Sequence, residues 1–296
     1  MNDKIIVITS DNREIILDKK LKEFKYYEFS FIINSVYCYK KKINFKYLKI
    51  KDIYSNIFFN SKDTISSYSS IAKNTRSASW TKLLCIYSYL KKNYDYIIYM
   101  DSDCIFYNQK LSLNKLISKI KKEKKLGLLY SDKPWNCNLP NAGFMILRNS
   151  KYTKKLIKFW WNSKDYLNSH KHPYEQKKLH EFWASNTLNI KKNIIFIKKN
   201  ISSIKTNKNL IYHITSNYKN RENIFKKFIK EKKININYER KKIQKNIKIF
   251  DPKNKDIIMN NKKNNLQDYF IILLNSYILL PTLLTLKKFK NLMNYL

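Results

Sequence analysis

The stretch Tyr96-Ile-Ile-Tyr-Met-Asp-Ser-Asp103 joins a short apolar run to two aspartates. An apolar run of this length is typical of a strand buried on both faces. Asp101 and Asp103 follow at its end, and in open α/β sheets ligands bind beyond the carboxyl ends of the strands. Carboxylates at i and i+2 can share one divalent cation, and such hard oxygen ligands suit Mg²⁺ or Mn²⁺. That cation would favour a nucleoside diphosphate as the bound ligand, because it neutralises charge on a leaving phosphate.

Strand-like and helix-like segments alternate on both sides of this stretch, which predicts an α/β fold. The predicted strands lie within 1–10 and at 45–50, 96–100, 126–130, 144–147, 194–197 and 210–213. The predicted helices cover 21–41, 77–92, 111–125 and 150–168, and a further helix begins near Tyr174.

The composition excludes several classes of protein. The 296 residues include only two glycines, Gly127 and Gly143, so dinucleotide-binding and Walker phosphate loops are absent. The four cysteines are scattered and form no C-x-x-C pair, which argues against a zinc ribbon or a disulfide framework. The net charge of +38 comes from lysine far more than arginine. Because Lys, Asn, Ile, Tyr and Phe all have AT-rich codons, this charge is weak evidence about binding partners.

The end of the chain differs from the rest. From about 218 to 266 the sequence is rich in Lys, Asn and Ile, and residues 270–286 are its most apolar stretch. This stretch is shorter than a membrane span and is interrupted by Asn275, Ser276 and Pro281. We expect C-terminal helices packed on the domain, with a membrane-surface contact through 270–290 and its lysines as the alternative. The N-terminus has no signal peptide or apolar anchor, which predicts a cytoplasmic protein, with peripheral membrane contact as an option.

Several further motifs occur in a fixed order around the two aspartates. They are Trp80-Thr-Lys82, then Asp101-Ser-Asp103, Asn141-Ala-Gly143 followed by Arg-Asn-Ser150, Glu175-Gln176, and His213 after a strand.

Together these motifs, over about residues 75–220, resemble the GT-A nucleotide-sugar glycosyltransferases, most closely glycosyltransferase family 34. Glycogenin-like and family 77 transferases share much of the pattern and stay open. The resemblance implies a GT-A, Rossmann-like catalytic domain over 1–220 and a C-terminal extension over 221–296. It also implies metal-dependent transfer of a sugar from a UDP- or GDP-sugar to a hydroxyl of a glycan, glycolipid or glycoprotein, with retention of configuration.

The resemblance also implies a role for individual residues. Asp101, Asp103 and His213 would hold Mn²⁺ (or Mg²⁺), with Asp101 near the ribose. Lys82 would reach the diphosphate or the donor sugar, and Lys219 and Arg221 would clamp the leaving diphosphate.

Four residues would bind the sugars. Asn141 and Gly143 would line the donor pocket. Asp132 is expected either to hydrogen-bond sugar hydroxyls or to cap the turn before Pro134. Glu175 and Gln176 would lie on the far face of the anomeric carbon, and Glu175 stands where the resemblance leads us to expect an aspartate.

The alternative is a basic nucleic-acid-binding or membrane-surface protein in which the D-x-D pair is incidental. The scarcity of arginine and the lack of a helix-turn-helix or RRM signature argue against nucleic acid. His170, His172 and His180 are expected in a polar loop rather than in a zinc site. Trp160, Trp161 and Trp183 are expected in the core rather than stacked on sugars.

Overall fold

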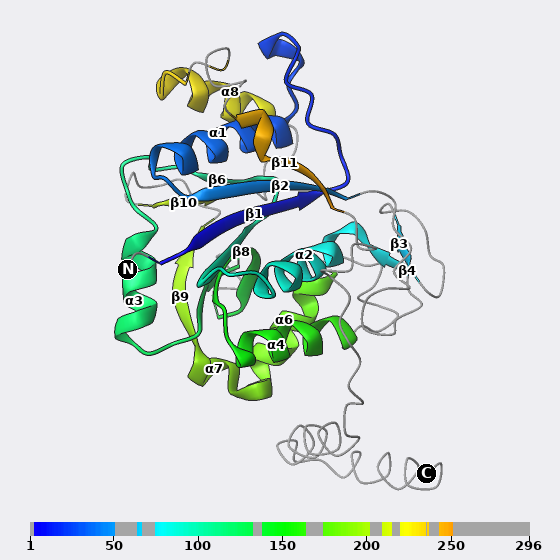
Figure 1. Cartoon of the computed structure of the whole chain (residues 1–296), viewed down its shortest axis with the longest axis vertical. Helices are drawn as coiled ribbons and strands as arrows, with labels where there is room; N and C mark the ends of the chain where they lie inside the picture. Colours follow the sequence, from blue (N-terminus) through cyan, green and yellow to red (C-terminus); the bar gives the residue numbers. More distant parts are fainter. Residues whose placement is uncertain are drawn as a thin grey trace, which may run out of the picture.

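The computed structural model describes residues 3–50, 64–66, 75–132, 138–163, 174–201, 209–214, 220–234, 236 and 243–250. A seven-stranded sheet in the order β11-β2-β1-β5-β8-β7-β9 forms its centre (Figure 1). The strands are β1 (Ile5–Asp11), β2 (Asn44–Ile50), β5 (Tyr96–Met100), β7 (Gly127–Ser131), β8 (Pro140–Arg148), β9 (Ile194–Asn200) and β11 (Ile247–Phe250). The predicted α/β class with a GT-A, Rossmann-like sheet is therefore confirmed.

Helices cover both faces of the sheet (Figure 1). On one face lie α1 (Tyr26–Lys40), α3 (Asn114–Lys122) and α8 (Arg221–Glu231). On the other lie α2 (Thr81–Leu90), α4 (Lys151–Asn162), α6 (Glu175–Ala184) and α7 (Ile190–Asn193). Two small sheets pair β3 (Thr64–Ser66) with β4 (Thr75–Ser77) and β6 (Cys104–Phe106) with β10 (Ile211–His213). Short 3-10 turns are η1 (Leu21–Glu23), η2 (Ala78–Trp80), η4 (Thr187–Asn189) and η6 (Gln244–Asn246).

Strand β5 shows why the sheet needs both layers. All of its side chains are buried, as its apolar run predicts. Ile98 and Met100 join the hydrophobic cluster beneath α1, whereas Ile97 and Tyr99 join the cluster beneath α2. Successive side chains of a strand point to opposite faces, so an uninterrupted apolar run requires cover on each side.

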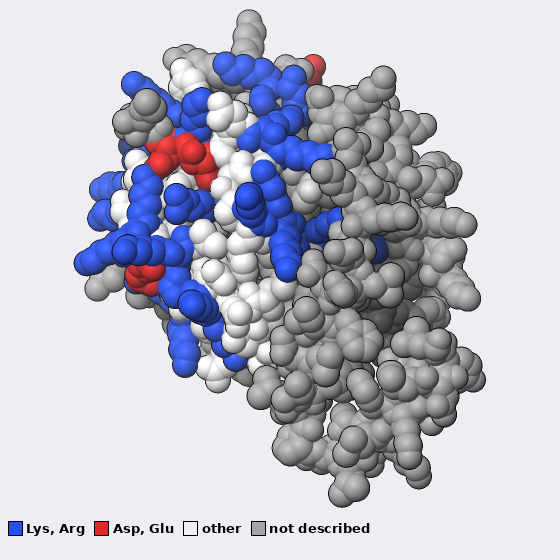
Figure 2. Space-filling view, turned by 60° about the horizontal axis from the view of Figure 1, so that its bottom comes forward, with Lys and Arg blue, Asp and Glu red and all other residues white. Residues whose placement is uncertain are grey.

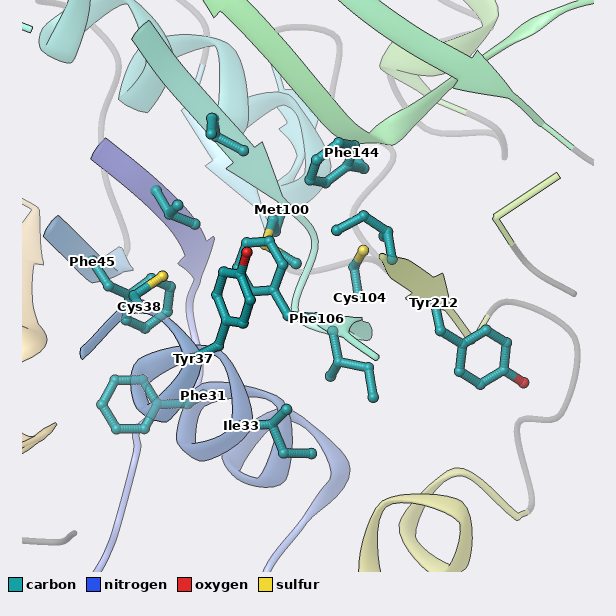
Figure 3. Close-up of a cluster of buried hydrophobic side chains, with 14 of the residues drawn as sticks. Phe31, Ile33, Tyr37, Cys38, Phe45, Met100, Cys104, Phe106, Phe144 and Tyr212 are labelled. Carbon is teal, nitrogen blue, oxygen red and sulfur yellow. The ribbon is translucent and has the colours of Figure 1, made fainter. Parts of the chain in front are cut away.

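The two clusters differ in their aromatic packing. In the cluster beneath α1, the rings of Tyr37 and Phe106 stack with centroids 4.0 Å apart, next to Met100 at the end of β5 (Figure 3). In the other, Trp80 and Trp161 meet edge to face with centroids 6.2 Å apart. Trp160, Trp161 and Trp183 are buried in that cluster, so the prediction that they belong to the core is confirmed.

Most predicted elements are present, with shifted ends. The helix predicted from residue 21 begins at Tyr26, because Glu28 accepts the backbone N–H of Lys25 at 2.8 Å and caps the first turn. Strands β6 and β11 were not predicted. Helix α8 packs against α1 and β11 pairs with β2, so the sheet and its cover continue past residue 220, where we placed the end of the catalytic domain.

The apolar stretch 270–286 lies outside the described residues. Within the described ranges, no helix combines the length and apolar character that a bilayer crossing needs. Cys38, Cys85 and Cys104 are free thiols in the core, as the scattered spacing predicts, and Cys137 is outside the described residues.

Asn34 ties helix α1 to strand β6, directly after the two aspartates. Its amide nitrogen donates to the carbonyl of Cys104 at 2.8 Å, and its amide oxygen accepts the N–H of Phe106 at 3.0 Å. The neighbouring Ser35 is equally buried, but its hydroxyl has no hydrogen-bond partner in the described part of the chain.

We therefore expect Asn34→Leu to destabilise the protein by about 2 kcal/mol or more, because it leaves the buried Phe106 N–H unpaired. Ser35→Ala, one residue along the same helix, should change the stability by no more than about 0.5 kcal/mol. Urea unfolding followed by circular dichroism measures both. Equal losses for the two variants would show that the α1–β6 link does not carry this stability.

Candidate functional site

The direction of β8 gathers the polar residues at one edge of the sheet. β11, β2, β1 and β5 run parallel, and β7 runs parallel to β9, whereas β8 is antiparallel to its neighbours β5 and β7. The start of β8 therefore lies beside the end of β5, with Phe144 opposite Met100. Asn141 at the start of β8 consequently bonds Asp132 after β7, and the carbonyl of Gly143 accepts the N–H of Asp101 after β5 at 2.8 Å.

The pairing of β6 with β10 adds His213. β6 begins directly after Asp103, and in the antiparallel register His213 lies opposite Cys104. The N–H of Ile214 donates to the carbonyl of Asp103 at 3.0 Å. Asp103 and His213, which are 110 residues apart in the sequence, are thereby held side by side through backbone hydrogen bonds.

Asp101, Asp103 and His213 can hold a metal ion. One ligand atom from each lies within 4.8 Å of the others, and no other such cluster occurs among the described residues. The His213 Nε2 lies 2.9 Å from Asp103 Oδ1 and 3.9 Å from Asp101 Oδ2. Two carboxylates and an imidazole are acceptable ligands for Mn²⁺ or Mg²⁺, so this donor set fits the predicted ion.

Asn141 fixes the orientation of the His213 ring. The Asn141 amide nitrogen donates to Asp132 at 2.9 Å, and its amide oxygen accepts the Gly143 N–H at 2.7 Å. Because that oxygen acts as an acceptor, His213 Nδ1, 3.2 Å away, must carry a proton to bond with it. The other ring nitrogen, Nε2, is thereby directed at Asp103, an arrangement common among metal-binding histidines.

Gly143 makes room for this ring. A Cβ at this position would overlap the His213 ring and lie 2.7 Å from its Nδ1. Gly143 is not among the described residues that line the cleft, and its expected place in the donor pocket stays a prediction. The absence of a side chain at Gly143 leaves room for the His213 ring.

Burial and neighbouring charges shift the pKa values of the three metal-ligand side chains. Burial raises the pKa of Asp101 above its usual range, with Lys82 and His213 acting in the opposite direction. Burial also acts to raise the pKa of Asp103, but His213 and Arg221 hold it below its usual range. Burial would lower the pKa of His213, yet Asp103 and Asp101 raise it above its ordinary value. Without metal, the two carboxylates therefore favour a proton on His213 Nε2, the ring nitrogen that faces Asp103.

Lys82 lies between two carboxylates. Its Nζ is 2.6 Å from Glu175 Oε1, 3.0 Å from Asp101 Oδ1 and 3.3 Å from the carbonyl of Ala142. Burial acts to lower the pKa of Lys82, but Asp101 and Glu175 raise it well above its usual range. All three N–H groups of the ammonium have acceptors within the protein, so Lys82 orders Asp101 and Glu175 rather than presenting a free donor to a ligand.

The remaining predicted residues lie around the same centre. Arg221 Nη2 is 3.1 Å from Asp103 Oδ2, and the Gln176 side-chain oxygen accepts the Ala142 N–H at 2.9 Å. Asp132 is buried and accepts a hydrogen bond from Asn141, whereas the turn at Pro134 lies outside the described residues. Glu175 Oε2 is buried without a hydrogen-bond partner in the part of the chain that the structure describes. Lys219 lies outside the described residues.

These side chains line a cleft of about 490 Å³, and a second set of residues that we did not predict lines it too. The unpredicted set comprises Ser10, Asp11, Asn12, Arg13, Tyr26, Ala78, Ser79, Tyr99, Ser102 and Tyr174. Asp11 follows the apolar part of β1 just as Asp101 follows β5. The same strand-end argument could have identified it, but the sequence analysis did not include Asp11 among the candidate site residues.

Arg13 connects this second set to the metal ligands. Its guanidinium bonds Asp11, donates to Tyr26 Oη at 2.6 Å and donates to the hydroxyl of Ser102, between the two aspartates, at 3.0 Å. The Arg13 and Arg221 guanidinium groups lie 4.9 and 5.0 Å from the centre of the Tyr26 ring.

Among the other histidines, His180 is the one that lies within the described residues. His180 lies on α6 rather than in a loop, where its Nε2 is 2.9 Å from the carbonyl of Pro140, and burial lowers its pKa. His170 and His172 lie outside the described residues.

Comparison with known proteins supports the fold. Neither a family model nor a curated protein matches the sequence. A crystal structure of a glycosyltransferase involved in the glycosylation of the major capsid of PBCV-1 is similar, with a TM-score of 0.52 and 15% identity. The match covers 75% of this chain and 98% of that one. The galactosyltransferase LgtC, solved with donor and acceptor sugar analogs, matches at a TM-score of 0.36 and 13% identity over 65% of this chain and 72% of its own. That score is too low to support an argument.

The chain thus has the fold of a glycosyltransferase, as the resemblance to GT-A nucleotide-sugar transferases predicts. Neither solved protein is named as a member of family 34, so that narrower assignment stays a prediction.

Substituting the two glycines separates the metal site from general stability. Gly143→Ala should displace His213 and weaken Mn²⁺ binding by at least about tenfold, the effect reported for loss of a metal-orienting contact. Gly127→Ala is the matched control, since its Cβ would meet the Ile146 carbonyl at 2.7 Å in the same sheet but at the end of β7 away from the cleft.

We expect both variants to melt at a lower temperature and only Gly143→Ala to lose Mn²⁺ affinity, measured by isothermal titration calorimetry. Unchanged affinity in Gly143→Ala would contradict the role given to His213.

The raised pKa of His213 predicts a pH-dependent stability. The interaction of protonated His213 with Asp103 is fully present below about pH 6.5, the ordinary imidazole value, and is lost as the pH rises through the higher folded pKa. The metal-free protein should therefore lose its melting-temperature advantage over His213→Asn as the pH rises above about 6.5.

Excess Mn²⁺ should reverse this trend, because the ion binds the neutral ring. Differential scanning fluorimetry across a pH series measures this melting-temperature difference. It should fall with rising pH in EDTA and rise with pH in excess Mn²⁺. A difference between wild type and variant that does not change with pH would contradict the pairing.

Proposed function

We propose that this protein is a metal-dependent glycosyltransferase that moves a sugar from a nucleoside diphosphate sugar to a hydroxyl acceptor. One observation carries the proposal: the separate motifs around Asp101, Asn141, Glu175 and His213 meet in one cleft at the carboxyl edge of the sheet. An incidental D-x-D pair would not require a histidine from a distant strand beside it. The glycosyltransferase fold supports the same conclusion.

Asp101, Asp103 and His213 would hold the divalent cation. When bound, the cation would neutralise negative charge on the diphosphate of the donor. Arg221, beside Asp103, would add a second positive group for the same diphosphate, and a guanidinium suits phosphate oxygens.

The end of the cleft nearest β1 suits the nucleoside. Asp11 and Arg13 offer hydrogen-bonding groups there, and Tyr26 offers an aromatic ring. These hydrogen-bonding groups and this ring suit the ribose and the base of either UDP or GDP.

The opposite side of the cleft suits the sugars. Asp132 and Asn141 would hydrogen-bond hydroxyl groups of the donor. Glu175 has one oxygen held by Lys82 and one without a protein partner, so the second is placed to accept a hydrogen bond from a sugar hydroxyl. Lys82 would act as a positioning residue, since Asp101 and Glu175 both depend on it. Gln176 would lie beside Glu175, on the side of the anomeric carbon away from the leaving group.

We extend the proposal to retention of the anomeric configuration, which the family 34 resemblance implies. Attack on the face of the leaving group would then be assisted by the departing phosphate. NMR of the product tests retention, because the anomeric configuration of the transferred sugar should be the same as in the donor.

The direct test is turnover of a panel of UDP- and GDP-sugars by the full chain, with Mn²⁺ or with EDTA. We expect one donor to turn over only with metal, and Asp103→Asn to lower the rate by about a hundredfold or more. The matched control is Asp95→Asn, which changes an exposed aspartate at the opposite end of β5. It should keep the wild-type rate.

The proposal is wrong if no donor turns over and if Mn²⁺ with UDP or GDP also fails to raise the melting temperature. Equal loss of turnover in both variants would show that Asp103 has no special role.

A further inference from the structure

The helical layer formed by α2, α4, α6 and α7 has a nearly uniform positive surface. Its lysines, including the two that follow α2, define what we call the lysine face: Lys91, Lys92, Lys151, Lys154, Lys155, Lys158, Lys177, Lys178, Lys191 and Lys192. Among the described residues of these helices and of the segment that follows α2, the acidic side chains are the exposed Asp95, Glu175, which is buried in the cleft, and Glu181, which pairs with Lys178 at 2.6 Å. The view from the side of α4 and α7 shows Lys and Arg spread over this surface and few acidic groups (Figure 2).

The opposite layer differs. Around α1 and α8, lysines are interspersed with the acidic residues Glu14, Asp18, Glu23, Glu222 and Glu231. Ion pairs on this layer include Glu14 with Lys49 at 3.2 Å and Glu231 with Lys227 at 3.9 Å. A coding bias that enriches lysine would affect both layers alike, so it does not explain why acidic residues are scarce on one of them.

The lysines of this face are close enough to repel one another. Burial lowers the pKa of Lys91, and the nearby charge of Lys154 lowers it further. These two residues come from different helices, α2 and α4, which pack directly together. An anionic surface can bind several such neighbouring lysines at once.

We propose that the lysine face binds an anionic membrane surface. All of its positive groups are lysines, which act as point charges suited to diffuse attraction, rather than arginines with their fixed fork for phosphate. Aromatic side chains of these helices, such as Trp160, Trp161 and Phe182, are buried and are unavailable for stacking on nucleic acid bases. The sequence also contains an apolar stretch at 270–286 followed by Lys287, Lys288 and Lys290, a composition that suits a lipid interface and not a nucleic acid.

The test is co-sedimentation of the full chain with vesicles of phosphatidylcholine alone or with about one third phosphatidylserine. The test variant carries Lys151→Glu, Lys155→Glu, Lys191→Glu and Lys192→Glu. The control carries Lys40→Glu, Lys227→Glu, Lys230→Glu and Lys232→Glu on the opposite layer. All eight lysines are exposed, and both variants undergo the same change in net charge.

Wild type and control should bind the anionic vesicles and not the neutral ones. The test variant should bind at least about tenfold more weakly, because each lysine near an anionic surface contributes separately. Equal loss in both variants would show that total charge alone is responsible, and no loss in the test variant would place the contact elsewhere. Both results would overturn the proposal.

Binding to a DNA or RNA duplex that is lost only in the test variant, without binding to anionic vesicles, would also overturn it. Because these lysines lie outside the cleft, donor turnover should be equal in all three proteins. Failure of the lipid proposal therefore leaves the proposed function intact.

Discussion

The pairing of β10 with β6 is the constraint on which the site depends. β6 has only three residues, yet its register with β10 decides which residue of the later strand lies beside Asp103. A slip of one residue would turn His213 to the opposite face and remove the imidazole from the two carboxylates. Asn34 on α1 holds β6 from the other side through two backbone groups. The helix, the two short strands and the metal ligands thus form one connected unit.

Charge balance within the cleft follows from this geometry. Three carboxylates, Asp101, Asp103 and Glu175, lie at the carboxyl edge with three basic groups from other elements, Lys82, His213 and Arg221. Charges removed from water are tolerated when they are paired and hydrogen-bonded. In the proposed reaction, a divalent ion in place of the proton on His213 would add positive charge next to the diphosphate of the donor. The hydrogen bonds from Asp132 through Asn141 to His213 keep the imidazole in place for either state.

The sequence predicted most of the sheet and the central residues of the site, for physical reasons. Apolar runs such as Tyr96–Met100 are long enough to specify a strand, and the aspartates mark its end. Strand β6 escaped prediction because three residues carry no readable periodicity, and its pairing with β10 is a long-range contact. β11 escaped because it lies in a Lys-rich segment whose composition we took for an extension.

The interpretation of single residues was less secure, because their roles depend on neighbours in space. Gly143 is needed by His213, which no local pattern reveals. Lys82 lines the cleft, but its partners there are two carboxylates and a carbonyl group, which the sequence does not indicate. Arg13 and Tyr26 line the cleft from just after β1 and the start of α1, where the sequence analysis predicted only a strand and a helix.

The central claim is that Asp101, Asp103 and His213 together bind a divalent cation. Pulsed electron paramagnetic resonance of the protein with stoichiometric Mn²⁺ tests it most directly, because a coordinated imidazole produces a nitrogen hyperfine coupling. We predict this coupling in the wild-type protein and its loss in His213→Ala. Bound Mn²⁺ without a nitrogen ligand, or a coupling that persists in His213→Ala, would contradict the account.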